Sequence, residues 1–500
     1  MAPRQLPSLP QYRKDAVTRR LCASAHLDAD FARQIRAYFT TESLHAVGLP
    51  LGINLVALVR HCRAAAARQD RLDHRLAWLF AGFLASLLVV LGGLVSGSSP
   101  AMLAGGAGFL GALAGAWALV YTTEAQSRDL AVDIHHVRTN AKTEDLAPAA
   151  PAELEAHLHE VKRANVLPYS AEAELDNPFV GSGAKVRDTG WQPIDVSRPA
   201  DDPSGGGKLT IIDFDAVDLH TYVAREMEKI AGLDGLRANN RLYVIGSHVQ
   251  YLGPELLPDP LGRPRARIDK GLVQAGLLNP GAGMRTYLSL ERVGEGGRAI
   301  VSMYLRARVQ HPSLTWEVTA CVLPPVGPRF SRVDRLPLGG AERWWSLVAY
   351  TTGGFWPALR GATGRIRRRS AERNRQERAL DKRRKGITKR NELYDYGAIN
   401  SVREWIGDND QMGHSERTDA RDFLYRLQGG VLTATERFLK AHNVDTSSFD
   451  AAQQSIITQT YTVNGNVTGP SNFGNNGQIA QYGQQPQAQP PAGQGGAAHP

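Results

Sequence analysis

The sequence runs LAWLFAGFLASLLVVLGGLV from Leu76 to Val95 and AMLAGGAGFLGALAGAWALVY from Ala101 to Tyr121. No charged residue occurs in the 48 positions from Leu76 to Thr123. About 20 apolar residues in a helix, rising about 1.5 Å each, cross the roughly 30 Å hydrocarbon core of a bilayer. The linker SGSSP between the two runs favours a reversal of the chain. The sequence therefore predicts a transmembrane helical hairpin over residues 76–121.

Small residues in the second run predict how the two helices pack. Gly111 and Gly115 form a G-x-x-x-G pair, and Gly108 lies in a row of small residues spaced four apart. A helix face without bulky side chains lets two backbones approach closely in lipid. We therefore expect Gly108, Gly111 and Gly115 to form the helix-packing face. Neither run contains an ionisable residue, which argues against a pore.

The charges on either side of the hairpin predict its orientation. The first run is preceded by Arg60, Arg63, Arg68, Arg71 and Arg75, the second is followed by Arg128, Arg138 and Lys142, and the linker has no basic residue. Because cytoplasmic flanks carry the excess of Lys and Arg, we expect a two-pass protein of the cell membrane with both termini in the cytoplasm. A secretory signal peptide fits less well, since the apolar runs begin far from the N-terminus and are too long for its core.

Upstream of the hairpin, the sequence predicts a small amphipathic helix and leaves one apolar run open. Asp28 is a candidate N-cap for this helix. The apolar positions that follow at helical spacing are Phe31, Ile35, Tyr38 and Phe39. Residues 51–59 are apolar but short, so we expect a juxtamembrane helix there, with a third spanning helix as the alternative.

The chain beyond the hairpin predicts a cytoplasmic α+β domain. Four runs of β-type residues follow one another, at residues 241–252, 285–293, 298–309 and 314–323. A glycine-rich turn at 294–297 between two of them indicates an antiparallel meander. Residues 209–214 are predicted as a further strand and residues 216–233 as a helix. Helices are also expected over residues 152–167 and 392–454.

These patterns divide the chain into seven parts. The expected parts are a cytoplasmic N-terminal helical region (1–75), the transmembrane hairpin (76–121), a juxtamembrane helix and loop (122–208), the α+β cytoplasmic domain (209–340), an aromatic and basic docking segment (341–390), a helical region (391–459) and a low-complexity tail (460–500). The predicted fold class is α+β, with a transmembrane helical hairpin, a cytoplasmic antiparallel-sheet domain and a helical C-terminal region.

Two stretches carry a resemblance to other proteins. They are NPFVGSGAKVRDTGW from Asn177 to Trp191 and RRLCASAHLDADFARQI from Arg19 to Ile35. Together they resemble uncharacterised actinobacterial two-helix membrane proteins that share an N-P-F-x-G-x-G…W segment after a hydrophobic hairpin. The resemblance covers about the first 330 residues. It supports the membrane topology and implies no activity.

The strongest functional signal is an aromatic segment joined to a basic one. Residues 344–359 read WWSLVAYTTGGFWPAL, which is too short and too interrupted by Gly and Pro to span a bilayer. Trp and Tyr favour the headgroup layer, and polybasic clusters gain on the order of 1 kcal/mol per Lys or Arg near an anionic leaflet. We expect docking on anionic lipid headgroups through Trp344, Trp345, Trp356, Arg365, Arg367, Arg368 and Arg369.

Two alternatives to lipid docking stay open for this segment. In the first, the aromatic residues belong to a core and the arginines form a solvated helix face. In the second, the basic helix binds nucleic acid, against which we weigh the lack of a nucleic-acid-binding motif in the chain. The basic residues themselves are concentrated: between Arg360 and Arg390 there are 14 Lys or Arg and three acids, a net charge of +11, and the whole chain carries +9.

No segment carries a catalytic constellation. SGGGKLT at residues 204–210 lacks the first Gly and the hydroxyl of a phosphate-binding loop, so we expect a flexible loop there. The histidines at 135, 136, 157 and 159 have spacings that do not share a helix face, and the three cysteines lack C-x-x-C spacing. Asp215 or Asp218 is predicted to cap a helix. We expect no cofactor and no metal.

The C-terminal tail is rich in Asn, Gln, Gly and Pro and is expected to be disordered in isolation. Its alternating polar and β-branched residues suggest self-association through a cross-β ladder as the alternative. On this basis we expect a membrane-tethered interaction or regulatory protein rather than an enzyme. The alternative is a membrane-associated enzyme whose site lies around the Asn177–Trp191 loop and the following strands of the α+β domain. Such an enzyme would require a polar pocket with converging ionisable groups.

Overall fold

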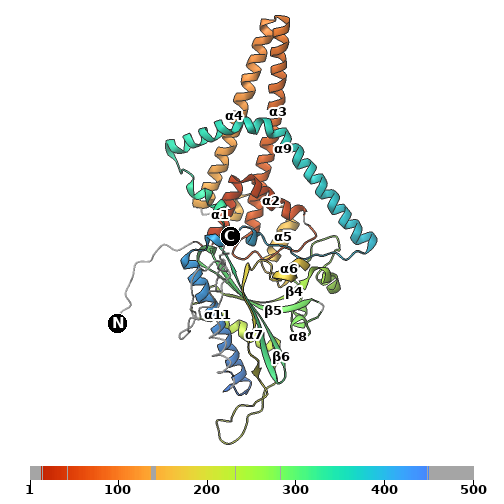
Figure 1. The fold of residues 1–500 in the computed structure, drawn as a ribbon, viewed down its shortest axis with the longest axis vertical. Coiled ribbons are helices and arrows are strands. Elements are labelled where there is room, and N and C mark those ends of the chain that lie inside the picture. Colours follow the sequence, from red (N-terminus) through yellow and green to blue (C-terminus); the bar gives the residue numbers. More distant parts are fainter. Residues whose placement is uncertain are drawn as a thin grey trace, which may run out of the picture.

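The computed structural model describes residues 13–449, apart from Lys14, Glu42, residues 137–141, Ala231, Ala282 and Ser448. Within these residues, a pair of long helices projects from one end of the molecule and a β-sheet lies in the body (Figure 1). The predicted mixed α+β fold with two long apolar helices is confirmed. The predicted tail at 460–500 lies outside the described residues.

Helices α3 (Leu55–Ser96) and α4 (Ser99–His136) form the projecting hairpin. The side chain of Asn54 caps α3 by accepting hydrogen bonds of 3.1 and 3.3 Å from two N–H groups of its first turn. Gly97 ends α3 with φ of 68°, a left-handed conformation that glycine adopts without a steric penalty. The chain therefore reverses within two residues, and both helices extend below the predicted spans into the body.

Two short helices pack against the lower part of the hairpin: α1 (Ala16–Leu27) and α2 (Ala29–Thr41). Between them, Asp28 Oδ1 accepts hydrogen bonds from the N–H groups of Asp30 and Phe31 at 3.1 and 3.0 Å, so the predicted cap is confirmed. The apolar run at residues 51–59 had a third spanning helix as its alternative prediction. Its residues 55–59 are at most 4% exposed. They belong to the core of the body, at the start of α3.

The sheet has seven strands in the order β1-β4-β5-β6-β7-β2, and β3 also pairs with β7. The strands are β1 (Val166–Tyr169), β2 (Ala184–Gly190), β3 (Ile194–Asp195), β4 (Arg237–Ile245), β5 (Met284–Val293), β6 (Ile300–Gln310) and β7 (Ser313–Leu323). Strands β4 to β7 form the predicted antiparallel meander. Strand β1 joins β4 in parallel at one edge.

The two faces of the sheet pack against different helices. One face lies under α7 (Ala216–Met227) and α11 (His414–Ala441), and Trp316 is fully buried between them. The predicted capping of α7 is confirmed, because Asp215 and Asp218 form a capping box. The other face packs partly against the helices below the hairpin. This second face is left partly open, and one of the two clefts described below lies there.

The remaining helices connect these layers. They are α5 (Ala152–Val161), α6 (Ala171–Asp176), α8 (Lys270–Leu278), α9 (Gly340–Arg390) and α10 (Val402–Trp405), with short 3-10 segments at Thr143–Leu146, Gly246–Glu255, Glu295–Gly297, Pro328–Arg335 and Asn409–Gln411. Helix α9 is the longest, with 51 residues, and it crosses the base of the hairpin (Figure 1). It joins the hairpin to the sheet domain.

Several predicted elements differ from the structure. The β-type run at residues 241–252 leaves the sheet at Ile245, where β4 ends, and the rest of it lies in the 3-10 segment Gly246–Glu255. Residues 209–214 form no strand, because the N–H groups of Leu209 and Ile212 bond to carbonyl oxygens of Ala200 and His442 outside the sheet. The helix predicted over 152–167 ends at Val161, and its last residues form β1 instead. Pairing with β4 outweighs local helix propensity there. The helical region predicted over 392–454 begins with an extended segment and contains only α10 and α11 among the described residues.

Candidate functional site

The two hairpin helices approach closely at a few small residues. A Cβ added at Gly105 would lie 2.7 Å from Val90 Cγ2, and one at Gly108 would lie 2.5 Å from Ser86 Oγ. A Cβ at Gly115 would make an ordinary contact of 3.6 Å with Leu79. Within the described residues, nothing lies within 4 Å of the Cβ position of Gly111. Of the predicted glycines, Gly108 therefore lies in the tight interface, whereas Gly105 was missed.

The projecting part of the hairpin exposes apolar side chains. The exposed large hydrophobic residues there are Trp78, Leu84, Leu87, Leu88, Val89, Leu91, Leu94, Val95, Leu103 and Leu110. Val95 is 91% exposed and Leu103 is 75% exposed, both near the tip. By length and composition, α3 and α4 could each cross a membrane. A surface of this kind marks a site of contact with lipid or with another protein.

Helix α9 packs across the base of this apolar hairpin. The buried cluster at the crossing consists of Leu72, Leu76, Ala116, Val120, Leu359 and Ala362, with Phe355 and Ala358 beside it. The ring of Trp356 lies edge-on to Phe83 with centroids 5.6 Å apart, and Trp117 Nε1 donates a hydrogen bond of 3.2 Å to Thr352 Oγ1. The helix is continuous through Pro357. The aromatic half of α9 is therefore fixed to both hairpin helices.

Two of the predicted docking arginines form ion pairs with the hairpin. Arg365 donates to Asp73 Oδ1 from Nε and Nη2 at 3.0 and 2.7 Å, and Arg369 pairs with both Asp73 and Asp70. Asp73 is fully buried, and Asp70 also receives a hydrogen bond of 2.9 Å from Arg36. These pairs bind α9 to α3. The side chains of Arg365 and Arg369 therefore face α3.

The other predicted docking residues face outward. Trp344, Trp345 and Trp356 are 50%, 62% and 40% exposed, and Arg367 and Arg368 are exposed. Trp344 and Trp345 lie in the first turns of α9, where Arg343 pairs with Asp129 of α4. The structure therefore separates the predicted set into an exposed aromatic group, two exposed arginines and two arginines paired with α3.

A chain of buried polar side chains lies below the crossing and was missed by the sequence analysis. Arg68 Nη1 donates to His26 Nδ1 at 3.1 Å, His26 Nε2 is 3.0 Å from His61 Nδ1, and His61 Nε2 is 2.9 Å from the carbonyl oxygen of Thr143. The Thr143 carbonyl oxygen can only accept, so His61 Nε2 must donate to it and His61 Nδ1 is left to accept. His26 Nε2 then donates to His61 Nδ1, and both histidines can be neutral. Burial lowers the pKa of His26 and of His61, which favours this neutral state.

The N-P-F-x-G-x-G segment forms a tight loop around a carboxylate. Glu404 Oε1 accepts hydrogen bonds from the N–H groups of Gly181 and Gly183 at 2.8 and 2.9 Å. Asn177 closes the loop by donating from Nδ2 to the carbonyl oxygen of Gly183 at 2.9 Å. Phe179 stacks on Tyr304 of the sheet with ring centroids 4.0 Å apart. The Asn, the Phe and both Gly of the motif thus have structural roles, and Phe179 and the two glycines join the loop to β6 and α10.

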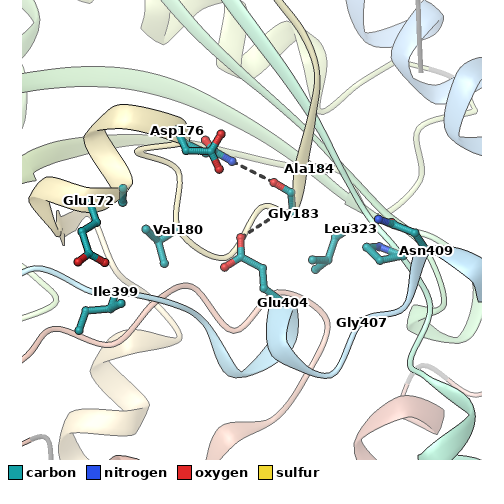
Figure 2. A pocket seen from close by; sticks show the side chains of 13 residues that line it. Glu172, Asp176, Val180, Gly183, Ala184, Leu323, Ile399, Glu404, Gly407 and Asn409 are labelled. Carbon is teal, nitrogen blue, oxygen red and sulfur yellow. Dashed lines mark hydrogen bonds between the residues drawn. The ribbon is translucent and has the colours of Figure 1, made fainter. Parts of the chain in front are cut away.

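Two clefts lie beside this loop. The first has a volume of about 460 Å³, and Figure 2 shows Glu172, Asp176, Val180 and Glu404 among its lining residues. Burial raises the pKa of Glu404, against the opposing effect of its backbone N–H donors. The second, of about 500 Å³, lies over the open face of the sheet, where Tyr287 and Thr319 line it. Among the described residues that line the two clefts, none is a His, Cys or Ser.

Two other sequence motifs have ordinary structural roles. Residues 204–210 lie in a loop in which Asp202 Oδ1 accepts a hydrogen bond of 2.9 Å from the N–H of Ser204. His135 Nε2 lies 2.8 Å from Asp334 Oδ1 in an ion-pair geometry. Among the residues that the structure describes, no group of three His, Cys, Asp or Glu side chains has metal-binding geometry.

The fold defines the class of the chain as a mixed α+β protein with two candidate membrane-spanning helices. The family model of the AbeC-like domain matches residues 190–478, which is more than half of the chain. The chain belongs to the AbeC-like domain family. The match begins just before Trp191 and includes the meander, α9 and α11, whereas the hairpin precedes it. No curated protein and no solved structure matches the chain.

Proposed function

We propose that this protein is a membrane-tethered interaction or regulatory protein, anchored by the α3–α4 hairpin and oriented by α9. The hairpin supplies the anchor and the AbeC-like domain supplies the binding surface. The observation that carries the proposal is the packing of α9: its aromatic half crosses the hairpin just where the exposed apolar surface begins. A helix that only bridged two soluble domains would have no reason to present exposed Trp side chains at that level.

The level of the crossing agrees with the dimensions of a bilayer. From Leu76 to Ser96, α3 rises about 30 Å, which matches the hydrocarbon core. Trp356 contacts Phe83, which lies about 10 Å along α3 from Leu76. Interfacial helices sink about 5–10 Å into the boundary between headgroups and acyl chains. The aromatic half of α9 would then lie in that boundary, with the Asp73 ion pairs just below it.

The arginines flanking the hairpin support a cytoplasmic location for the body. Arg60, Arg68 and Arg128 all make contacts within the body or with α9, and they lie at the end of the hairpin away from the turn. An excess of basic residues on this side follows the positive-inside rule. Both termini of the chain would then be cytoplasmic, and only the turn at residues 97–98 would face the other side.

The depth of α9 can be tested with spin labels in phosphatidylcholine vesicles. The three native cysteines are buried, so that single-cysteine variants can be labelled selectively. A nitroxide at Trp345→Cys is expected to collide readily with oxygen and poorly with a water-soluble nickel chelate, because the side chain lies among lipids. A nitroxide at Arg378→Cys is the matched control, and it should show the opposite order. Equal nickel accessibility at both positions would contradict the proposed depth.

The enzyme alternative has one observation in its favour. The two clefts lie beside Asn177–Trp191, where an enzyme site was expected. Glu404 lines one of the clefts, and its pKa is raised by burial. A carboxyl whose pKa is raised by burial is a candidate general acid. Its oxygen is, however, held by the N–H groups of Gly181 and Gly183, which suits a structural role. We therefore keep the interaction function as the main proposal.

Two further proposals rest on sequence alone. The resemblance to actinobacterial two-helix membrane proteins is consistent with a hairpin followed by the N-P-F-x-G-x-G loop. Self-association through the tail concerns residues outside the described part of the chain, and it stays a prediction.

A further inference from the structure

The second half of α9 carries a regular row of cations along one face. The row consists of Arg367, Arg368, Arg375, Arg378, Lys382, Lys385 and Lys389, which we call the cationic stripe. From Arg375 onward its members are spaced 3, 4, 3 and 4 residues apart, the spacing that keeps side chains on one side of an α-helix. All seven side chains are exposed. Over about 33 Å of helix, the stripe therefore presents a line of positive charge to solvent.

The stripe points away from the hairpin. At about 100° of rotation per residue, Arg365 and Arg369 lie roughly 140° around the helix from the centre of the stripe. These two arginines are the ones that pair with Asp70 and Asp73 of α3. The acids of this segment, Glu372, Glu377 and Asp381, also fall outside the stripe. Of the 14 basic residues between Arg360 and Arg390, two thus hold the helix to α3 and seven form the stripe, and the other five are Arg360, Arg373, Arg383, Arg384 and Arg390.

The stripe also leads away from the proposed membrane level. One end of this helical half is fixed at the hairpin base by Arg365 and Arg369. After its other end, Tyr394 Oη lies 2.8 Å from His45 Nε2 and Tyr396 donates to the carbonyl oxygen of Pro260, beside the sheet domain. Figure 1 shows this half of α9, in cyan, running from the hairpin base down the edge of the molecule. Charges are screened over about 8 Å at physiological salt. A membrane at the hairpin could therefore neutralise only the first cations of the stripe, Arg367 and Arg368.

The chemistry of the stripe identifies its ligand. The hot spots of protein interfaces are Trp, Tyr and Arg side chains in desolvated pockets, unlike this exposed row, and single-stranded nucleic acids stack on aromatic rings. Residues 360–390 contain no aromatic residue, and between the cations the stripe face holds small residues such as Ala371. The tail beyond residue 450 has no charged side chain, so that it offers no complementary charge. The ligand that matches the stripe is a polyanion with regularly spaced charges on its outer surface.

We propose that the cationic stripe of α9 binds the phosphate backbone of double-stranded nucleic acid, without reading its sequence. This binding goes beyond the proposed anchoring and requires only that the stripe faces water. Seven cations would displace several condensed counterions, so that affinity should fall steeply with salt. Because contacts of Arg and Lys with phosphate carry no sequence information, duplexes of different sequence should bind alike.

The test uses the full chain in phosphatidylcholine nanodiscs and a fluorescein-labelled duplex of about 20 base pairs. Anisotropy should show micromolar binding at low salt, and the slope of log affinity against log salt should be near −6, as expected for about seven phosphate contacts. The double variant Arg378→Glu/Lys382→Glu should weaken binding at least tenfold and make the slope shallower by about 2. Changing the duplex sequence should change affinity less than threefold.

A charge-matched control separates the stripe from overall charge. Arg373→Glu/Arg383→Glu changes the net charge equally, on exposed positions of α9 outside the stripe. It should weaken duplex binding less than threefold. An equal loss in both variants would overturn the proposal, as would wild-type protein that binds anionic vesicles but not the duplex. Retention of the protein in nanodiscs during gel filtration reports on the anchor independently, so that failure of the stripe and failure of the anchor are distinguishable.

Discussion

Replacing Asp73 by Ala is expected to lower the free energy of unfolding by about 3 kcal/mol and to release α9 from the hairpin. Asp73 is fully buried and is the shared partner of Arg365 and Arg369. Removing Asp73 leaves Arg365 without its carboxylate partner, whereas Arg369 keeps Asp70. The expected cost lies at the lower end of the range because Arg365 is one-third exposed and can regain water. Thermal unfolding in nanodiscs measures the loss.

Asp70→Ala is the control for this prediction. Asp70 also contacts Arg369 and Arg36, but its side chain is 27% exposed. Solvent-exposed pairs contribute about 1 kcal/mol or less. Limited proteolysis between α9 and the sheet domain should increase for Asp73→Ala and change little for Asp70→Ala. If the two variants lost the same stability, the buried pair would not be what holds α9.

Gly181→Ala is expected to destabilise the sheet domain by about 4 kcal/mol, enough to prevent folding in a marginally stable domain. Gly181 has φ of 107°, a backbone conformation that side chains rarely adopt. A Cβ there would overlap the carbonyl oxygen of Leu49, which is backbone and does not move aside easily. The same change would displace the N–H that binds Glu404. Denaturant unfolding followed by far-ultraviolet circular dichroism measures the effect.

Two control variants test why Gly181→Ala loses stability. Within the described residues nothing lies within 4 Å of the Cβ position of Gly190, at the end of β2, so Gly190→Ala should change the stability by less than about 1 kcal/mol. Glu404→Gln keeps an oxygen that can accept from the N–H groups of Gly181 and Gly183, and it should remain folded. A folded, stable Gly181→Ala protein would show that the loop is not fixed as described.

The hairpin and the meander could be predicted because their signals are local. The uncharged run from Leu76 to Thr123 and the β-type runs after residue 240 are each contained in one segment. The cap at Asp28 is local as well, since its bonds reach only three residues ahead. By contrast, the strand expected at 209–214 depended on a free sheet edge, which local composition does not reveal.

The site at the hairpin base could be predicted only in part. Gly353, Gly354 and Pro357 favour an interruption, yet α9 continues through them because Leu359 and neighbouring residues pack on the hairpin. Asp73 and Arg365 are separated by 292 residues, so that no sequence pattern pairs them. The sequence therefore located the aromatic and basic residues of α9 but not which of them face the protein.

The same reasoning applies to the loop at Asn177. Its glycines were visible in the sequence, but the carboxylate that they bind comes from Glu404, more than 200 residues further along the chain. The spacing of the cations in the stripe is likewise visible in the sequence. The structure adds that Arg365 and Arg369 face α3 and do not belong to the stripe, whose seven cations are exposed.

We propose above that the α3–α4 hairpin spans the membrane with the body on one side. The most direct test is the labelling of Ser98→Cys and Arg378→Cys, each in the full chain, with a membrane-impermeant maleimide in intact cells from which the outer wall has been removed. The native cysteines are buried and should not interfere. We predict labelling of position 98 in intact cells and of position 378 only after the membrane is permeabilised. Labelling of both positions only after permeabilisation, or of both before it, would contradict a spanning hairpin.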